Sequence, residues 1–500
     1  SEKDGQSLLD DNGEPLGVAA NAELGFIAAT NKFEDSNDYM TTHATILTRK
    51  DWANTQPKAP EGESFTAPEA VCDAIDHYSA TTFDYQNDPL LGNVEGSAVY
   101  QSTAPVSAQD NGMVLSDMRG LDYYDDSWDL LLDQIDYSKT DEIVTLLYGG
   151  AYNLGGLESI GMAQTRSAEG PSGFGLFAHL FYGDTRVNKL NRMCGYPAGT
   201  VLASTWDPEM AYLKGSSIGQ EAFWFIVSEG TYLNGWTGPS MNLQRNAFNG
   251  RNAEYYSEDP VLAGEMGARE ISGAGDSGLY TIFKHFAMNN IETAKTLGGG
   301  ICTWATEQAM RESYFKVFET VFKDARREVK YIADDNGTVA TKIMRGATAV
   351  MTSFNRIGAV PSGSNYALIT ELLKHEWGFQ GFVQTDMPSQ SNKDQMLRAG
   401  GSVEMNSGAA APADLTSPTA QHQIRRAVHD IAFAVVNSSA MQGVAPGSMI
   451  YYDMSPWAII LMIANIVVYA LILAGLVWIA LRLVDARRHP EKYKGSGERI

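Results

Sequence analysis

The sequence predicts an α/β fold, with a TIM-like (β/α)8 barrel as the favoured architecture and a single transmembrane helix near the C-terminus. Two observations predict the barrel: strand-like runs alternate with helical segments from Met113 onward, and several of these runs end in polar residues. A long uncharged segment predicts the membrane helix. We therefore expect four parts: an acidic, loop-rich segment (1–112), the barrel (113–445), the membrane helix (457–481) and a basic tail (482–500).

Composition excludes some broad classes of protein. The chain has 500 residues, with 37 Lys and Arg against 60 Asp and Glu, giving a net charge of −23. A surface this acidic repels phosphate backbones, so we expect no nucleic-acid partner. With 44% hydrophobic residues the chain can bury a large core, which argues against a disordered or fibrous protein.

The three cysteines, Cys72, Cys194 and Cys302, are too few and too far apart for a disulfide scaffold or a zinc site. We expect all three to be buried thiols. The sequence indicates no metal site and no cofactor.

Residues 1–112 contain loop-forming stretches such as LLDDNGEPLG and short β-like runs such as Thr45–Leu47. We interpret this part as a linker or as the end of another domain.

Strand-like apolar runs in the next part each end in polar residues. The four runs are Gly199–Ser204, Thr281–Phe283, Ala347–Met351 and Gly381–Gln384, and they lead to Thr205-Trp206, Lys284-His285, Thr352-Ser353 and Thr385-Asp386. A (β/α)8 barrel assembles its site from the C-terminal ends of many strands, as this pattern suggests. An open doubly wound sheet is the alternative, but the chain lacks the GxGxxG and GxxxxGK[ST] phosphate loops that often accompany it.

Helical segments lie between these runs. Ser138 is a candidate N-cap for the helix TDEIVTLLY, and a second helix is expected to begin near Thr306. The second helix has one apolar face, formed by Met310, Tyr314, Val317 and Val321.

The membrane helix is predicted from Ala458–Leu481, 24 residues without a charge. At about 1.5 Å per residue such a helix crosses a hydrocarbon core of about 30 Å. Trp457 and Trp478 lie near its ends, and the tail from Arg482 holds six basic and three acidic residues. The positive-inside rule places that tail in the cytoplasm and the barrel outside the cell membrane. The chain begins SEKDGQSLLD, so we expect an export signal upstream or on a separate chain.

Three segments at the predicted strand ends combine charged and apolar residues: 242–260, 283–293 and 381–389. Their charged side chains include Arg245, Arg251, Lys284, His285 and Asp386. Such a mixture suits a sugar, whose hydroxyls take directional hydrogen bonds and whose ring faces pack on apolar groups. A carboxylate held among cations stays ionised and can act as a nucleophile.

These segments resemble glycoside hydrolase family 3, the retaining glycosidases, from about Met113 to Gly443. The motifs that carry the resemblance follow the family's order: GRNAEYYSEDP, KHFAMNN, VMTSFNRIG, HEWGFQGFVQTD and RAGGSVEM. The resemblance implies a (β/α)8-like barrel.

By motif, Asp386 matches the family's catalytic nucleophile, and Lys284 and His285 match the pair that binds sugar hydroxyls. Arg251 matches a substrate-binding arginine, and Arg245 lies just upstream in the same loop. The resemblance thus implies one catalytic residue, Asp386, and a substrate-binding set comprising Glu169, Arg245, Arg251, Lys284, His285 and Met387.

The chain departs from the family pattern at several of these positions. The family's Asp-Gly-Pro segment reads Glu169-Gly170-Pro171 here, and its following Arg is Gly175. Met387 and Phe354 replace aromatic residues often found in the family. The resemblance therefore does not identify which sugar is bound.

A retaining glycosidase also needs a second carboxylic acid about 5 to 5.5 Å from the nucleophile. Most of the family supplies it from an α/β sandwich domain after the barrel, but here the membrane helix follows within about fifteen residues. The order resembles a permuted branch in which the sandwich comes first. We expect a companion chain or an upstream α/β sandwich domain to supply this acid, and we interpret Glu254, Glu258 and Asp259 as structural.

The resemblance implies a membrane-anchored exo-β-glycosidase, most simply a β-glucosidase, that acts on a β-glycoside or oligosaccharide through a covalent intermediate on Asp386. Alternatives are a glycan-binding surface protein on a degenerate barrel, a phosphosugar-handling barrel and a structural membrane subunit. The phosphosugar alternative would need a Gly-rich anion site, for which Gly400-Gly401 is the only hint.

Overall fold

The computed structural model describes residues 33, 67, 69–149, 152–174, 193–229, 232–247, 249–292, 295, 300–386, 392–405, 411–448, 456–493 and 495. The chain divides into two compact units, Ser1–Met449 and Ile450–Ile500. Each unit is described by itself.

A six-stranded sheet forms the centre of the first unit. Its order is β1 (Asn153–Leu154), β2 (Thr165–Glu169), β3 (Gly235–Thr237), β4 (Tyr280–Phe286), β8 (Ala349–Thr352) and β11 (Phe382–Gln384). The strands from β2 to β11 run parallel, and β1 is antiparallel to β2. A parallel bridge from Gln384 to Val403 extends the sheet beyond β11. Every residue of β4 is buried, because helices cover both faces of a parallel sheet.

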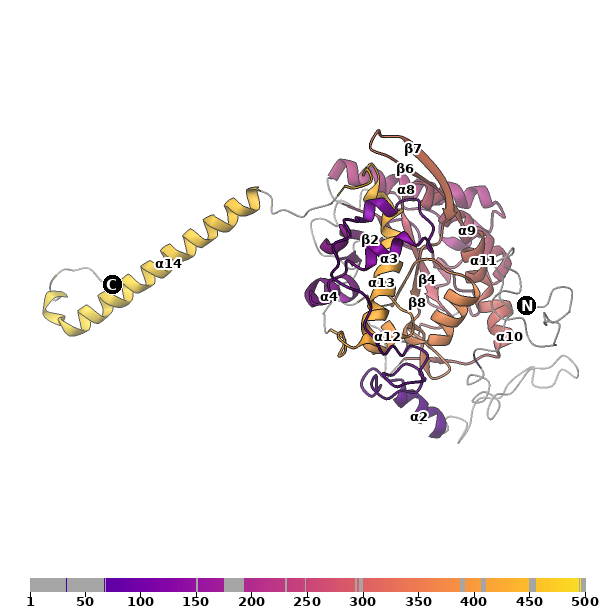
Figure 1. Cartoon of the computed structure of the whole chain (residues 1–500), viewed down its shortest axis with the longest axis horizontal. Helices are drawn as coiled ribbons and strands as arrows, with labels where there is room; N and C mark the ends of the chain where they lie inside the picture. The colour runs from indigo at the N-terminus through magenta and orange to yellow at the C-terminus, as the bar shows by residue number, and fades with distance from the viewer. Residues whose placement is uncertain are drawn as a thin grey trace, which may run out of the picture. The chain divides into compact units, whose positions relative to one another are not determined.

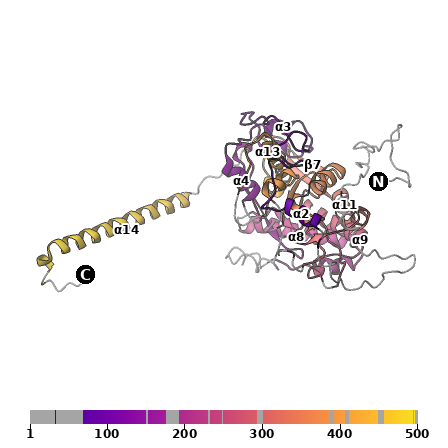
Figure 2. The same cartoon turned by 90° about the horizontal axis from the view of Figure 1, so that it is seen from below.

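The longer helices of this unit are α2 (Glu69–His77), α3 (Ser127–Leu132), α4 (Thr140–Tyr148), α8 (Pro208–Glu229), α9 (Pro260–Asp276), α11 (Lys316–Asp324), α12 (Lys393–Arg398) and α13 (Pro418–Val436). Figure 2 shows α3 and α13 on one side of the molecule and α8 and α9 on the other. Shorter helical pieces include α7 (Gly199–Ala203) and α10 (Glu307–Ala309), together with π-helical turns at Met310–Tyr314 and Ala367–Glu376.

Helices α9 and α13 begin where the sequence supplies a cap and a proline. The Asp259 carboxylate accepts hydrogen bonds from the N–H groups of Val261 and Leu262, and the Ser417 hydroxyl accepts one from the N–H of Ala420. A proline follows each cap at the first helical position, where its missing N–H costs nothing. These signals fix the start of both helices.

Helices α8 and α9 pack backbone to backbone because glycines lie between them. A Cβ atom added to Gly215 would lie 1.9 Å from the carbonyl oxygen of Glu270, and one on Gly273 would lie 2.2 Å from that of Tyr212. Larger residues would force the helices apart.

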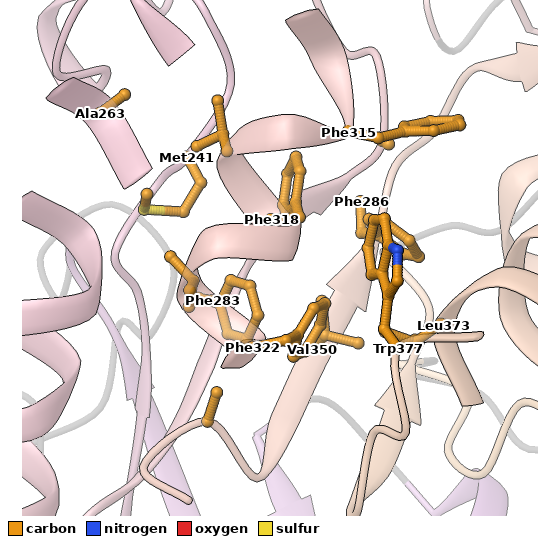
Figure 3. Close-up of a cluster of buried hydrophobic side chains, with 14 of the residues drawn as sticks. Met241, Ala263, Phe283, Phe286, Phe315, Phe318, Phe322, Val350, Leu373 and Trp377 are labelled. Atoms are coloured by element: carbon orange, nitrogen blue, oxygen red, sulfur yellow. The ribbon is translucent and has the colours of Figure 1, made fainter. Parts of the chain in front are cut away.

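The main hydrophobic core lies between the sheet and α11 (Figure 3). Phe283 of β4 packs on Phe322 of α11 with ring centroids 4.8 Å apart, and Phe286 lies 5.9 Å from Trp377. Successive aromatic residues of β4 thus join one cluster, which anchors the strand that carries Lys284 and His285.

Two smaller sheets lie outside the central one. Strands β6 (Arg326–Ile332) and β7 (Val339–Arg345) form an antiparallel hairpin (Figure 1). Strand β9 (Arg356–Ile357) pairs with β5 (Cys302–Thr303) and with β10 (Val360–Pro361). The second small sheet holds the segment after β8 against the segment before α10.

Residues 69–112 of the predicted linker-like part pack onto the rest of the unit. Phe83, Leu91 and Val99 form a cluster with Ala399, and Arg398 donates a hydrogen bond to the carbonyl oxygen of Leu91 at 2.9 Å. The predicted β-like run 45–47 lies outside the described residues.

The α/β prediction is confirmed, and the described residues supply five parallel strands of one sheet. The complete eight-stranded ring stays a prediction. One predicted strand is wrong: Gly199–Ser204 forms helix α7, since a six-residue apolar run is compatible with either structure.

Two smaller predictions are also wrong. Lys139, not Ser138, occupies the N-cap position of α4, because the Ser138 hydroxyl bonds the Asp136 carboxylate. Cys72 and Cys194 are exposed and Cys302 is only partly buried, because all three lie outside the apolar cores. The helix expected to begin near Thr306 does begin there as α10, and the Thr306 side chain caps it.

The second unit contains α14 (Pro456–Arg488), a 33-residue helix with mean hydropathy 2.7 in its most apolar window. None of that window is buried against protein. The helix is long and apolar enough to cross a membrane, and it extends past both ends of the predicted span 457–481.

Candidate active site

The C-terminal ends of the parallel strands carry most of the predicted site residues. Glu169 ends β2, Lys284 and His285 lie near the end of β4, and Asp386 follows β11 by two residues. Arg251 lies in the loop after β3. Because these strands are parallel, their C-terminal ends form one edge, and the side chains meet there.

Lys284 forms a buried ion pair with Glu169. Its ammonium contacts Glu169 Oε1, while the Tyr152 hydroxyl donates a hydrogen bond to Glu169 Oε2 at 3.1 Å. Burial lowers the pKa of Lys284 to about 7, although the negative charge of Asp386 opposes this shift. The pair can therefore change its charge state near neutral pH.

Arg251 is held by Glu254 and reaches His285. The guanidinium donates to both carboxylate oxygens of Glu254, at 3.0 and 2.8 Å, and lies 3.0 Å from His285 Nε2 through Nη1. Burial disfavours its charge, but Glu254 more than compensates and raises the pKa of Arg251 above its ordinary value. Ser240 also donates to Glu254 at 2.8 Å, so three hydrogen bonds hold this carboxylate.

His285 stays neutral in this environment. Burial first, and then the charges of Arg251 and Lys284, lower the pKa of His285 well below its ordinary value. Since Arg251 Nη1 can only donate, His285 Nε2 accepts, and the ring proton of the neutral imidazole lies on Nδ1. The imidazole therefore adds no positive charge beside Asp386.

Asp386 lies beside this cluster and remains partly accessible. Its Oδ2 is 3.5 Å from His285 Nε2, and 14% of the side chain is exposed. The charges of Arg251 and Lys284 interact favourably with the carboxylate. An accessible carboxylate next to cations has the properties required of a nucleophile.

The structure brings together Glu169, Arg251, Lys284, His285 and Asp386. Arg245 lies apart from this cluster, with its guanidinium 5.7 Å from the ring centre of Tyr314. Met387 lies outside the described residues. Glu258 is exposed and Asp259 caps α9, in keeping with structural roles.

Sequence reasoning missed Asn242, Tyr152 and Lys295. Asn242 fixes the backbone of His285 with two hydrogen bonds, at 3.0 and 2.9 Å. Its place at the start of the charged segment 242–260 was the available signal. Tyr152 contacts Glu169 and Lys295 disfavours the charge of His285, but no motif marks either residue.

The described part of the chain contains no candidate metal site. No three His, Cys, Asp or Glu side chains there are grouped so that they could hold an ion.

Part of the chain is similar to known glycosidases. Residues 152–333 match the family model described as "Glycosyl hydrolase family 3 N terminal domain". The chain is 31% identical over 266 residues to an exo-alpha-(1->6)-L-arabinopyranosidase of Bifidobacterium longum, covering 53% of this chain and 31% of that protein. It is 32% identical over 210 residues to thermostable beta-glucosidase B of Acetivibrio thermocellus, covering 42% and 24%.

Among solved structures, a beta-glucosidase from Paenibacillus barengoltzii superposes with a TM-score of 0.53 at 26% identity. The match covers 69% of this chain and 36% of that one. The chain spans about a third of the length of the curated relatives it matches.

Proposed function

The chain belongs to glycoside hydrolase family 3, and from this premise we propose that it is a membrane-anchored retaining exo-β-glycosidase, most simply a β-glucosidase. It would remove terminal sugars through a covalent glycosyl intermediate on Asp386. The similarity to an arabinopyranosidase makes a terminal arabinopyranose a second candidate for the released sugar.

One observation carries this proposal: Asp386 lies within 3.5 Å of His285 in a cluster with Arg251 and Lys284 at one edge of a parallel sheet. Cations stabilise the attacking carboxylate, and the neutral His285 can bond a sugar hydroxyl without adding charge.

The Lys284 and Glu169 pair supplies recognition. The ammonium donates hydrogen bonds and the carboxylate accepts them. The pair can therefore bind two neighbouring hydroxyls, one as acceptor and the other as donor. Glu169 is buried, and a longer side chain than the family's Asp brings its oxygens further from the strand. This difference would favour a sugar with a different hydroxyl arrangement.

Departure of the leaving group requires a proton donor, and we assign this role to another domain or chain. Glu254, the acidic residue of the Arg251 loop, is already bound by Arg251 and Ser240. A companion chain or an upstream α/β sandwich domain would place its acid about 5 to 5.5 Å from Asp386.

The anchoring part of the proposal rests on α14. Its apolar length and the basic residues after it favour a single crossing, with the sheet-bearing unit outside and the tail in the cytoplasm.

Asp386→Asn tests the catalytic assignment, since it removes the anionic attacker at nearly constant size. Turnover of an aryl glycoside should fall by about 10³-fold or more, with thermal stability kept. The exposed Asp335 gives a matched control, and Asp335→Asn should change neither property. If Asp386→Asn keeps more than about a tenth of the rate, corresponding to less than about 1.4 kcal/mol, Asp386 is not the nucleophile.

A further inference from the structure

The hairpin of β6 and β7 has one covered edge and one free edge. In β6, the N–H of Arg326 donates to the Ser272 hydroxyl at 3.0 Å, and the N–H of Glu328 donates to the Asp276 carboxylate at 2.6 Å. Both acceptors belong to α9, so α9 covers the edge of β6. The two strands form a sheet of their own at the margin of the first unit (Figure 1), and no third described strand pairs with β7.

The strand register decides which backbone groups of β7 point away from β6. Facing residues of an antiparallel pair alternate between those that exchange hydrogen bonds and those that do not. Glu328 directs its N–H to α9, so it exchanges no hydrogen bond with Ile343, the residue that faces it. By the same alternation, the N–H and C=O groups of Val339, Thr341 and Ile343 point to the free edge. Within the described residues, these groups have no hydrogen-bond partner.

The free edge of β7 carries uncharged, β-branched side chains. Val339 and Ile343 are 67% and 62% exposed, and Thr341 between them is also exposed. Lys342 lies on the other face of the strand, where its ammonium donates to Asp122 at 2.8 Å. Proteins commonly protect a free edge with outward charges, a proline or a bulge, and the stretch Val339–Ile343 has none of these. The edge is therefore open to pairing with another strand.

We propose that β7 pairs with β7 of a second copy of this chain, antiparallel and with Thr341 on the two-fold axis. Thr341 then faces Thr341 of the second copy, and on each side of the axis Val339 faces Ile343. Each facing pair exchanges two hydrogen bonds, and the β-branched side chains pack across the interface. The two hairpins become one continuous sheet.

Symmetry and hydrogen bonding together restrict this alignment. An axis between two residues would place a residue that points to the free edge opposite one that already bonds β6. The axis must therefore pass through a residue that points to the free edge. Only an axis through Thr341 brings Val339, Thr341 and Ile343 of both copies into facing pairs.

The distribution of charge in the hairpin also favours a second copy. The acidic turn Asp334-Asp335 precedes β7, and Arg345 ends it. In the antiparallel arrangement Arg345 faces Gly337 of the second copy, so the cation of one chain and the acidic turn of the other lie at the same end of the joined sheet. This contact occurs twice by symmetry, and it opposes the general repulsion between two chains of net charge −23.

The interface is small, because a single strand edge buries less than the roughly 800 Å² per partner of a standard interface. Association should therefore be weak and should depend on protein concentration. It does not depend on the proposed glycosidase activity.

Disulfide crosslinking tests both the interface and its register. The full chain in detergent would carry Cys72→Ser and Cys194→Ser, which remove the two exposed cysteines. New cysteines are then introduced singly, by Thr341→Cys, Val339→Cys, Ile343→Cys or Lys330→Cys. Facing residues that exchange hydrogen bonds have Cα atoms about 5.5 Å apart, which a disulfide can span.

Lys330 gives the matched control. It is exposed and faces Thr341 across the hairpin, so it lies on the same side of the sheet and at the same level as the axis. Three strand spacings separate it from Lys330 of the second copy, a distance of about 14 Å that no disulfide spans.

Under mild oxidation at about 100 μM protein, Thr341→Cys should give at least about tenfold more disulfide-linked dimer than Lys330→Cys. Val339→Cys and Ile343→Cys should each give little dimer alone, because each lies about 14 Å from the same residue of the second copy. An equal mixture of these two variants should give the dimer. Adding Ile343→Lys to Thr341→Cys should lower the yield several-fold, because it places a charge opposite Val339.

Three outcomes would overturn the inference. Equal crosslinking at all four positions would indicate random collision. Dimer from Val339→Cys or Ile343→Cys alone would indicate a different register. A yield from Thr341→Cys no higher than that from Lys330→Cys would show that the edge of β7 does not pair with a second copy.

Discussion

Neutralising Glu169 should change the stability of the protein in a way that depends on pH. Lys284 has its pKa lowered to about 7 by burial, far below the ordinary value of 10.5. Because this pKa is lower in the folded chain than in the unfolded chain, the folded state loses about 1.4 kcal/mol of stability per pH unit as pH falls from 10.5 to about 7, and the loss stays constant below about 7. Glu169→Gln removes the carboxylate that contacts the Lys284 ammonium. The attraction between these two charges is about 4 kcal/mol at an effective dielectric of about 20, which corresponds to about 3 units in the pKa of Lys284.

The pKa of Lys284 in Glu169→Gln should therefore fall well below 6, so the loss of stability continues below pH 7 in the variant, where it has become constant in the unchanged chain. The variant should lose about 2 kcal/mol relative to the unchanged chain at pH 5.5, and less than about 0.5 kcal/mol from this source at pH 8. Urea unfolding of the full chain in detergent, followed by near-ultraviolet circular dichroism at both pH values, measures the difference.

The kinetic counterpart is the alkaline limb of kcat/KM, which reports the free protein. We expect activity to fall as pH rises through about 7, where Lys284 loses its proton, and Glu169→Gln should move this limb one to about three pH units lower. Tyr152→Phe removes a partner of Glu169 but no charge, so it should leave both pH dependences in place. If Glu169→Gln loses the same stability at pH 5.5 and pH 8, and its alkaline limb of kcat/KM does not move, Glu169 does not set the pKa of Lys284.

Three further predictions concern anchoring, leaving groups and stability. Deleting 457–500 should release the protein from membranes as a soluble domain, and continued sedimentation with membranes at high salt would contradict the anchor. The chain alone should cleave a dinitrophenyl glucoside far faster than an alkyl glucoside, and adding the companion should recover the alkyl substrate; fast, equal turnover by the chain alone would place the acid within it. Asp430→Ala should cost about 3 to 5 kcal/mol in urea unfolding, because it leaves the buried Lys374 without its carboxylate and removes the carboxylate that Arg426 contacts at 2.8 Å; a loss below about 1 kcal/mol would show that these charges are not held by Asp430.

The strands around the site could be predicted because their sequences are apolar on both faces. Thr281–Phe283, Ala347–Met351 and Gly381–Gln384 fall within or beside β4, β8 and β11, which are wholly buried. Gly199–Ser204 is a similarly short apolar run but forms a helix, since a run of this length is compatible with either a strand or a helix. Packing decides such cases.

The motifs predict which residues belong to the candidate site, and this membership stays a prediction, but they do not predict how the residues pair. Motifs identified Lys284 and Glu169, yet they are 115 residues apart, and nothing local predicts that they form an ion pair. Arg245 and Arg251 share one loop and one motif, but the structure directs them to different surroundings. Contacts of this kind depend on strand order and loop course, which a single sequence does not specify.

The proposed function requires Asp386 to form a covalent bond with the sugar. The most direct measurement is mass spectrometry of the intact chain, and then of its peptides, after reaction with a dinitrophenyl 2-fluoroglucoside. We expect one added fluoroglycosyl group per chain, located on the peptide that contains Asp386 and absent from Asp386→Asn. An adduct on a different carboxylate, or an equal adduct on Asp386→Asn, would contradict it.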